Sequence, residues 1–263
     1  MMTRLDELLS GEKLFIGAHR GFSSNYPENT LLSIWEGVRL GVDLVEVDVY
    51  LTSDEIPVLA HDFRLERCSN AKGYIHEFSL SELKRLDFGG HKHSMFSGLK
   101  LPTLEEFVEM MLPAAHVLIN IDFKVYPHTM KTVQKVMPIL QSAGLIDRCI
   151  FNCVDCDVVE YLCDHYGKRT VGAPYFYPGI LNFKTGGNGT ISKLWGVCFP
   201  QKDLTPEHAE YYRSRGVSVV CTSPDTPEQV KQSLSCNAVL PLCNDPRNFI
   251  KTASDAGIWK PYA

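Results

Sequence analysis

Residues 44–49 read Leu-Val-Glu-Val-Asp-Val, an apolar β-branched run that contains two carboxylates. Such a run predicts a strand buried on both faces, as in a parallel sheet that helices cover. Glu46 and Asp48 are two residues apart, so their side chains point to the same side of the strand. This stretch therefore predicts a buried strand with a pair of carboxylates on one face.

Similar apolar runs recur along the chain and alternate with segments of helical periodicity. The eight expected strands are 14–18, 44–49, 117–121, 149–151, 170–173, 194–199, 217–221 and 238–242. The expected helices are 30–40, 104–111, 129–143, 157–166, 206–215, 227–234 and 247–256. Three of these helices have a threonine at the expected capping position. Eight strand–helix units in one chain predict an α/β fold, the (β/α)8 TIM barrel.

Residues 63–100 interrupt this alternation. The segment is rich in glycine and polar residues and contains one expected short helix, 79–86. We interpret it as an insertion after the second strand, on the side of the barrel where active sites form. The connection 175–193 has no clear helix, because it is rich in glycine and aromatic residues. The length of 263 residues fits a single domain spanning 1–263.

The composition excludes several classes of protein. With 26 Lys and Arg against 31 Asp and Glu, the formal charge is −5, which argues against a nucleic-acid-binding surface. The sequence contains no run of about 18 apolar residues, the length that a transmembrane segment requires. The first residues do not resemble a secretory signal. The nine cysteines are odd in number and scattered, which predicts reduced thiols and a cytoplasmic location. The sequence does not indicate an oligomeric state.

Polar residues gather just past the expected strand ends, which face one common mouth in a barrel. They are His19, Arg20, Glu46, Asp48, His61, Asp62, Asp122, Lys124, Asn244 and Asp245. Carboxylates are hard ligands for Mg²⁺ or Ca²⁺, whereas arginine and lysine supply positive charge for a phosphate. Histidines exchange protons near neutral pH. These residue types predict an enzyme that acts on a phosphate compound with a divalent cation.

Short motifs follow one another in a fixed order between about residues 14 and 250. They are His19-Arg20-Gly21, Pro27-Glu28-Asn29-Thr30, Glu46-x-Asp48, Thr52-x-Asp54, Pro57-Val58-x-x-His61-Asp62, Leu65-x-Arg67, Leu83-x-x-Leu86-Asp87, Pro102-Thr103-Leu104-Glu105-Glu106, Asp122-x-Lys124 and Asn244-Asp245-Pro246. In this order the series resembles the glycerophosphodiester phosphodiesterase family. The fold of that family is the same barrel, with an insertion after the second strand.

The resemblance implies a role for each matching residue. Glu46, Asp48 and Asp122 bind a divalent metal, Mg²⁺ or Ca²⁺. His19 and His61 are the acid–base pair, and Arg20 and Lys124 hold the substrate phosphate. Glu28 and Asn29 support the site. The implied reaction cleaves a small glycerophosphodiester, such as a deacylated phospholipid, to glycerol 3-phosphate and an alcohol.

The chain departs from the family pattern at two positions. Asp122 stands where the family has glutamate, and its shorter side chain suits Ca²⁺ better than Mg²⁺. Cys221 stands where many members have tryptophan, and we expect this loss to reshape the alcohol side of the pocket. Two alternatives therefore stay open: release of a headgroup from a lysophospholipid, or an inactive barrel that only binds phosphodiesters or a protein partner. A sphingomyelin-cleaving toxin on a related barrel is disfavoured by the unpaired cysteines and the lack of a signal.

Other polar clusters have simpler interpretations. The group Cys149, Cys153, Cys156 and Cys163 fits small core residues better than a zinc site. His91-Lys92-His93 fits an exposed loop better than a second metal site. Asp245 fits a helix cap before Pro246. The aromatic residues between 175 and 183 are equally compatible with a pocket lining and a packed loop.

Overall fold

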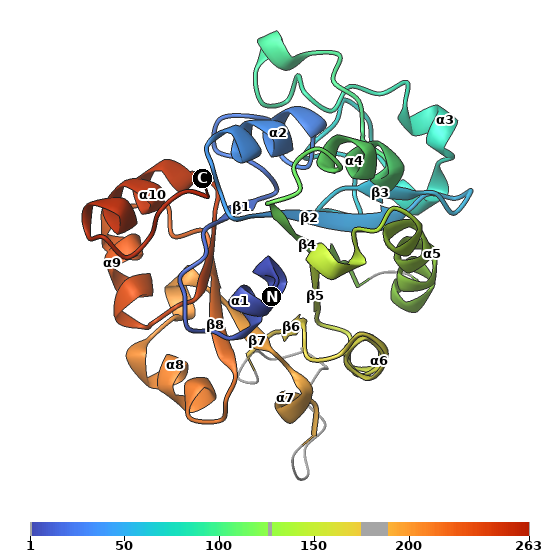
Figure 1. The fold of residues 1–263 in the computed structure, drawn as a ribbon. Coiled ribbons are helices and arrows are strands. Elements are labelled where there is room, and N and C mark those ends of the chain that lie inside the picture. The colour runs from blue at the N-terminus through green and yellow to red at the C-terminus, as the bar shows by residue number, and fades with distance from the viewer. Residues whose placement is uncertain (1, 126–127, 175–188, 263) are drawn as a thin grey trace.

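Eight parallel strands close into a barrel, as expected for a TIM barrel (Figure 1). This computed structural model describes residues 2–125, 128–174 and 189–262. The parallel strands are β1 (Gly17–His19), β2 (Leu44–Leu51), β4 (Leu118–Phe123), β5 (Cys149–Cys153), β6 (Thr170–Gly172), β7 (Gly196–Pro200), β8 (Ser218–Thr222) and β9 (Leu240–Cys243). Pairing of β1 with both β2 and β9 closes the ring.

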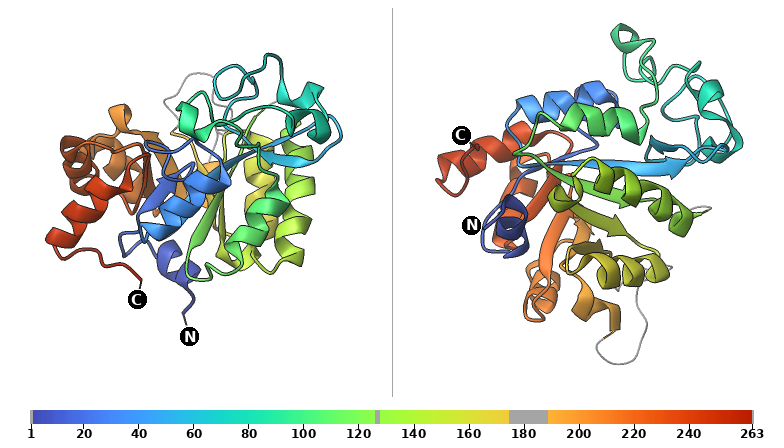
Figure 2. Two further views of the ribbon diagram at one scale, coloured as in Figure 1. Left: turned by 90° about the horizontal axis from the view of Figure 1, so that it is seen from above. Right: turned by 45° about the vertical axis from the view of Figure 1, so that its right-hand side comes forward.

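Most helices surround the barrel and cover the outer faces of its strands, whereas one closes an end of the barrel and one belongs to the insertion (Figures 1 and 2). Their bounds are α1 (Arg4–Leu9), α2 (Leu31–Arg39), α3 (Leu80–Leu83), α4 (Leu104–Met111), α5 (Thr129–Ser142), α6 (Cys156–Tyr166), α7 (Gly189–Lys193), α8 (Pro206–Arg213), α9 (Pro227–Ser235) and α10 (Pro246–Asp255). The side chains of Thr30, Thr205 and Thr226 accept the capping hydrogen bonds of α2, α8 and α9. The sequence did not predict α1 or α7.

Helix α1 closes one end of the barrel, which we call the base. Leu5 and Leu8 pack into a buried cluster with inward-facing strand residues such as Leu44 and Leu118. The indole of Trp195 donates a hydrogen bond of 3.0 Å to the carbonyl of Leu9 at the end of α1. In the left view of Figure 2, α1 lies at the opposite end of the barrel from the insertion.

The inward faces of the strands change character along the barrel axis. On β2 the inward series starts at Leu44 and continues through Glu46 to Asp48, and in register beside it β4 runs from Leu118 to Asp122. Apolar side chains thus fill the base, whereas charged side chains occupy the carboxyl ends of the strands. We call this second end the mouth.

The insertion forms a small subdomain beside the mouth. It starts after β3 (Pro57–Leu59), which pairs antiparallel with the end of β2. Short 3₁₀ turns and α3 follow before α4 begins. Their apolar residues form a separate cluster that contains Tyr50, Val58, Leu65, Ile75, Leu83, Phe88 and Leu101. Among the described residues, no helix has both the length and the apolarity that crossing a membrane requires.

Candidate active site

Three carboxylates converge at the mouth from two adjacent strands. Glu46 and Asp48 are buried on β2, and Asp122 lies beside Asp48 in the register of β4. One carboxylate oxygen from each residue lies within 4.8 Å of the other two. Burial and the neighbouring charges of Asp48 and Asp122 raise the pKa of Glu46 well above its ordinary value. The site thus concentrates negative charge in a buried environment.

Two positive side chains compensate part of this charge. Lys124 Nζ lies 2.7 Å from Asp48 Oδ1 and 2.5 Å from Asp122 Oδ2. Arg20 Nε lies 3.4 Å from Asp48 Oδ2, and the backbone N–H of Arg20 donates to Glu46 Oε2 at 2.8 Å. Although burial opposes it, the charges of Lys124 and Arg20 hold the pKa of Asp48 below its usual range. The structure therefore gathers the proposed metal ligands and phosphate-binding residues in one cluster.

His19 ends β1 at the edge of this cluster. Its Nδ1 lies 2.8 Å from Asn244 Oδ1, and its Nε2 lies 4.0 Å from Glu46 Oε2. Burial, followed by the charge of Arg20, lowers the pKa of His19 to about 3. Asn244 in turn donates to Asp225 Oδ2 at 2.8 Å. His19 is therefore a neutral imidazole at pH 7, and an amide determines its orientation.

His61 approaches from the other side, just after β3. Its Nδ1 lies 2.6 Å from Asp62 Oδ1, so this ring pairs with a carboxylate instead of an amide. Burial lowers the pKa of His61, and the positive charges of Lys124 and Arg20 add to that shift. The pKa of Asp62 falls to about 2, because hydrogen bonds from Arg67 and His61 outweigh its burial. The two histidines thus lie in different electrostatic environments.

Glu28 and Asn29 support the cluster. Asn29 is buried, donates to Asp48 Oδ2 at 2.6 Å and accepts from the Asp48 backbone N–H at 3.1 Å. Its φ of 55° lies in the left-handed region, which asparagine tolerates better than most residues. Glu28 Oε1 accepts from Arg20 Nη1 at 3.0 Å. Both side chains therefore hold residues of the cluster in place.

Sequence reasoning missed several neighbours of the cluster. Asp225 accepts a hydrogen bond from the side-chain nitrogen of Asn244. Ser23 Oγ donates at 3.1 Å to Asn244 Oδ1, the oxygen that faces His19. Lys92 of the insertion reaches the backbone carbonyl of Ser23, with Nζ at 2.9 Å. Asn244 had a signal, since it follows the last strand, but no role was assigned to it. Asp225 and Lys92 lie in segments expected on the active-site side, a loop after a strand and the insertion, but no local pattern indicated their contacts.

The simpler interpretations of three polar clusters agree with the structure. Cys149, Cys153, Cys156 and Cys163 are buried, and the described residues contain one candidate metal cluster, Glu46 with Asp48 and Asp122. His91, Lys92 and His93 lie in an exposed loop. The Asp245 side chain caps α10 by accepting from the Arg247 backbone N–H. The aromatic residues between 175 and 183 lie outside the described part of the chain.

The expectation for Cys221 is wrong. Its thiol is buried on the outward side of β8, where it lies 3.4 Å from Ser233 Oγ of α9. The adjacent residues Thr222 and Ser223 line cavities at the mouth instead. Because strand residues alternate between faces, a residue at position 221 packs against the helix layer and does not shape the pocket.

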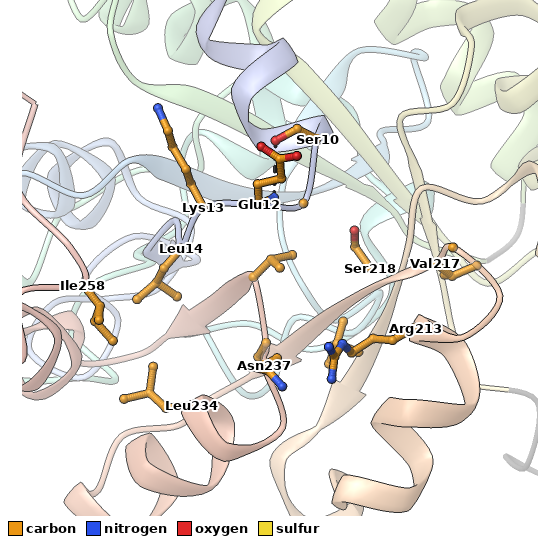
Figure 3. A pocket seen from close by; sticks show the side chains of 15 residues that line it. Ser10, Glu12, Lys13, Leu14, Arg213, Val217, Ser218, Leu234, Asn237 and Ile258 are labelled. Atoms are coloured by element: carbon orange, nitrogen blue, oxygen red, sulfur yellow. Dashed lines mark hydrogen bonds between the residues drawn. The ribbon is translucent and has the colours of Figure 1, made fainter.

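Cavities of different polarity open at the mouth. A polar one of about 370 Å³ is lined by His19, Arg20, Ser23, Ser24, Glu28, Lys92, Ser223, Asp225 and Asn244. A more apolar one of about 210 Å³ is lined by Asn152, Val154, Gly172, Ala173, Pro174, Cys198, Pro200 and Thr222. A larger cavity of about 730 Å³ lies at the base, between the segment after α1 and the loops before β8 and β9 (Figure 3). The base cavity lacks the histidines and the carboxylate cluster.

The residues at the mouth fit a divalent cation. All three candidate ligands supply carboxylate oxygens, the donors that Mg²⁺ and Ca²⁺ prefer. Burial and the charges of Asp48 and Asp122 raise the pKa of Glu46 despite the nearby Lys124 and Arg20. Asn120, in register with Glu46, is also buried with neither side-chain polar atom paired among the described residues. A hydrated cation would satisfy these groups.

Comparisons with known proteins agree with this site. Residues 19–171 match the model of the glycerophosphoryl diester phosphodiesterase family. The chain is 27% identical over 260 residues to a glycerophosphodiester phosphodiesterase of Caldanaerobacter subterraneus subsp. tengcongensis, covering 93% of this chain and 100% of that protein. A glycerophosphodiester phosphodiesterase of Bacillus altitudinis is 38% identical over 109 residues, 41% of this chain and 44% of that protein.

The fold is also similar to solved structures. The structure of an Oleispira antarctica phosphodiesterase, in complex with the product sn-glycerol-3-phosphate, superposes with a TM-score of 0.82 at 21% identity. The match covers 94% of this chain and 99% of that one. This likeness supports the barrel fold.

Proposed function

Because the chain belongs to the glycerophosphoryl diester phosphodiesterase family, we propose that the charged cluster at its mouth carries out the reaction of that family. The protein hydrolyses glycerophosphodiesters to glycerol 3-phosphate and an alcohol in a reaction that depends on a divalent metal. One observation carries the assignment of the site. Three carboxylates within 4.8 Å of one another lie beside two oriented histidines.

Each residue of the cluster has a specific part in this proposal. Glu46, Asp48 and Asp122 would hold the cation, which would supply positive charge for the phosphate and lower the pKa of an attacking hydroxyl. Arg20 and Lys124 bind the phosphate oxygens by charge-assisted hydrogen bonds. The complex of the Oleispira protein with sn-glycerol-3-phosphate supports a glycerol phosphate substrate.

His19 and His61 transfer the protons. One imidazole accepts the proton of the attacking hydroxyl, a neighbouring glycerol hydroxyl in the first step. The other imidazole delivers a proton to the alcohol oxygen as the P–O bond to the alcohol breaks and the new P–O bond to the glycerol hydroxyl forms. Water then opens the resulting cyclic phosphate to glycerol 3-phosphate, with the two imidazoles in exchanged roles. Both histidines have lowered pKa values, so each begins as an acceptor at neutral pH. The donor must first take up a proton, which the negative charge of the substrate favours.

Mg²⁺ and Ca²⁺ are the two candidate cations. The shorter side chain of Asp122 favours Ca²⁺, which accepts longer and less regular coordination than Mg²⁺. We expect Asp122→Glu to preserve or improve Mg²⁺-dependent turnover, because the longer side chain reaches a compact octahedral site. Complete loss of activity with both cations would show that the pocket is built around aspartate.

The decisive experiment measures phosphodiesterase activity on metal-stripped protein. The substrates are glycerophosphocholine, glycerophosphoethanolamine and a lysophospholipid, each with Mg²⁺, Ca²⁺ or a chelator. We expect cation-dependent release of glycerol 3-phosphate from at least one of the first two. No turnover of any substrate by folded, cation-loaded protein would favour a barrel that only binds phosphodiesters.

Release of a headgroup from a lysophospholipid is the second candidate activity. The apolar cavity of about 210 Å³ favours it, because Val154, Ala173 and Pro174 offer an apolar wall beside the cluster. In the same assay, this activity would appear as free headgroup from the lysophospholipid without glycerol 3-phosphate.

We further propose that the whole chain acts as one domain in a reducing, cytoplasmic compartment. All nine cysteines are free. Proteins of oxidising compartments usually pair such thiols. Titration of the protein unfolded without reductant should yield nine thiols, and a smaller number would contradict the proposal.

A further inference from the structure

Arg67 connects the insertion to both sides of the mouth. Its Nε donates to Asp62 Oδ2 at 2.5 Å. Its Nη1 and Nη2 donate to the two carboxylate oxygens of Glu28 at 2.6 and 2.8 Å. One guanidinium therefore holds two carboxylates that come from different segments of the chain. Neither carboxylate belongs to the metal cluster.

The first carboxylate leads to a histidine. Asp62 uses Oδ2 for Arg67 and Oδ1 for His61, so the bond from Arg67 determines how the carboxylate is rotated. Since a carboxylate only accepts hydrogen bonds, the 2.6 Å contact assigns the proton of His61 to Nδ1. This leaves Nε2 of His61 as the nitrogen that can accept a proton from the substrate.

The second carboxylate leads to the phosphate-binding arginine. Glu28 receives both Nη groups of Arg67, and its Oε1 also accepts from Arg20 Nη1 at 3.0 Å. Arg20 has a strained backbone, with φ at 58°, and its side chain also pairs with Asp48. Without Arg67, the Glu28 carboxylate would be free to rotate and would hold Arg20 less firmly.

Only arginine can make this set of contacts. Its guanidinium is planar and presents five donors in a fixed geometry, so it can bind one carboxylate with two groups and another with the third. Lysine has the same charge but concentrates it on one flexible ammonium. The side chain of Arg67 is 45% exposed, so water screens its ion pairs and their contribution to folding stability is small.

We propose that Arg67 is a positioning residue that couples the orientation of His61, through Asp62, to the placement of Arg20, through Glu28. This inference rests on the roles proposed above for His61 and Arg20. The insertion is then a part of the active site, because Arg67 fixes the positions of Asp62 and Glu28 relative to each other. The proposed reaction then depends on a residue outside the metal cluster.

The test begins with Arg67→Ala and a matched control, Arg64→Ala. Arg64 lies in the same insertion, but its guanidinium stacks on Tyr74 and donates to the Tyr74 hydroxyl. We expect Arg67→Ala to lower kcat/KM by about 10- to 100-fold, the range typical of residues that orient functional groups. Arg64→Ala should stay within about 2-fold of wild type. Thermal unfolding of both variants checks that they fold.

Chemical rescue separates positioning from a general structural role. Arg67 is partly exposed, so a soluble guanidinium can enter the space that Arg67→Ala leaves. Methylguanidinium should raise the kcat of Arg67→Ala by about 10-fold or more. The same concentration of NaCl should leave it unchanged. Arg67→Lys should remain impaired despite its charge, and it also serves if Arg67→Ala fails to fold.

Double variants identify the two branches. If Arg67 acts through Asp62, the double variant that combines Arg67→Ala with Asp62→Asn should have the same kcat as the less active of the two single variants. If Arg67 acts through Glu28, the double variant that combines Arg67→Ala with Glu28→Gln should have a KM no higher than the larger KM of the two single variants. Wild-type kinetics of Arg67→Ala, absence of rescue, or fully additive losses would each overturn the inference.

His61→Ala distinguishes this inference from the proposed function. If His61→Ala is inactive and Arg67→Ala has wild-type activity, only the role of Arg67 fails. If His61→Ala retains normal turnover, the proposed acid–base role of His61 fails, and the inference about Arg67 fails with it.

Discussion

The two ends of the barrel contrast in chemistry. At the base, α1 inserts Leu5 and Leu8 against apolar strand residues, and the neighbouring cavity measures about 730 Å³. At the mouth the two cavities are smaller, about 370 and 210 Å³. Yet the carboxylate cluster and the lowered pKa values of His19 and His61 belong to the mouth. Cavity size alone would have selected the wrong end.

The contrast reflects a division of labour along the strands. Apolar burial at the base stabilises the fold by about 25 cal/mol for each Å² removed from water. Like charges at the mouth oppose folding, because burial raises the pKa values of Glu46 and Asp122. Clusters of buried groups with displaced pKa values are typical of active sites. The same strands therefore contribute stability at one end and reactivity at the other.

The largest expected effect concerns the histidines of the mouth. His19→Ala and His61→Ala should each lower kcat by about 10²- to 10⁴-fold, because each removes one proton-transfer group. Steady-state kinetics with glycerophosphocholine or glycerophosphoethanolamine gives the loss. Circular dichroism should show folded protein, since neither ring belongs to the apolar base. Normal turnover of either variant would remove that histidine from the proposed mechanism.

Leu8→Ala should have the opposite pattern. Leu8 is fully buried under the barrel, so its truncation should cost about 2–5 kcal/mol in the free energy of unfolding. The kcat of the folded fraction should be unchanged, because the mouth lies at the other end of the strands. Urea unfolding and kinetics below the transition measure the two quantities. A large loss of kcat would show that the two ends are coupled.

Glu46→Gln should stabilise the metal-free protein while removing its response to cations. The folded pKa of Glu46 is raised, so its stabilising contribution is complete below the ordinary value of 4.5 and is lost as pH rises through the raised value. Glu46→Gln should therefore raise the free energy of unfolding more at pH 8 than at pH 5. The expected increase at pH 8 is about 1 kcal/mol. Thermal unfolding with Mg²⁺, Ca²⁺ or chelator tests this. Equal stabilisation of both proteins by cation would exclude Glu46 as a ligand.

The smallest effect should come from the base cavity. Arg213 lines it and pairs with Glu210 at 3.4 Å, on an exposed helix surface (Figure 3). Arg213→Ala should change kcat/KM by less than about 2-fold and the free energy of unfolding by less than about 0.5 kcal/mol, as is usual for surface changes. A marked kinetic effect would mean that the base takes part in function.

Much of the fold and site could be predicted, because the signals are local. Apolar β-branched runs located the parallel strands, and the ends of those runs located His19, Glu46, Asp48 and Asp122. Helix α1 was missed, since six residues give too short a pattern for helical periodicity. Cys221 was misplaced because a family comparison identifies a position in the sequence, whereas the strand register decides which face it occupies.

The sequence by itself determined the fold class, the family resemblance and the chemical types of the site residues, since strand periodicity and motif order are properties of neighbouring residues. Only the tertiary structure decided which partners each group meets. Asn244 beside His19 and Arg67 between Asp62 and Glu28 are contacts across long stretches of chain or between loops. The pKa shifts follow from those contacts and from burial, because both depend on what the closed barrel brings within a few ångströms of each charge.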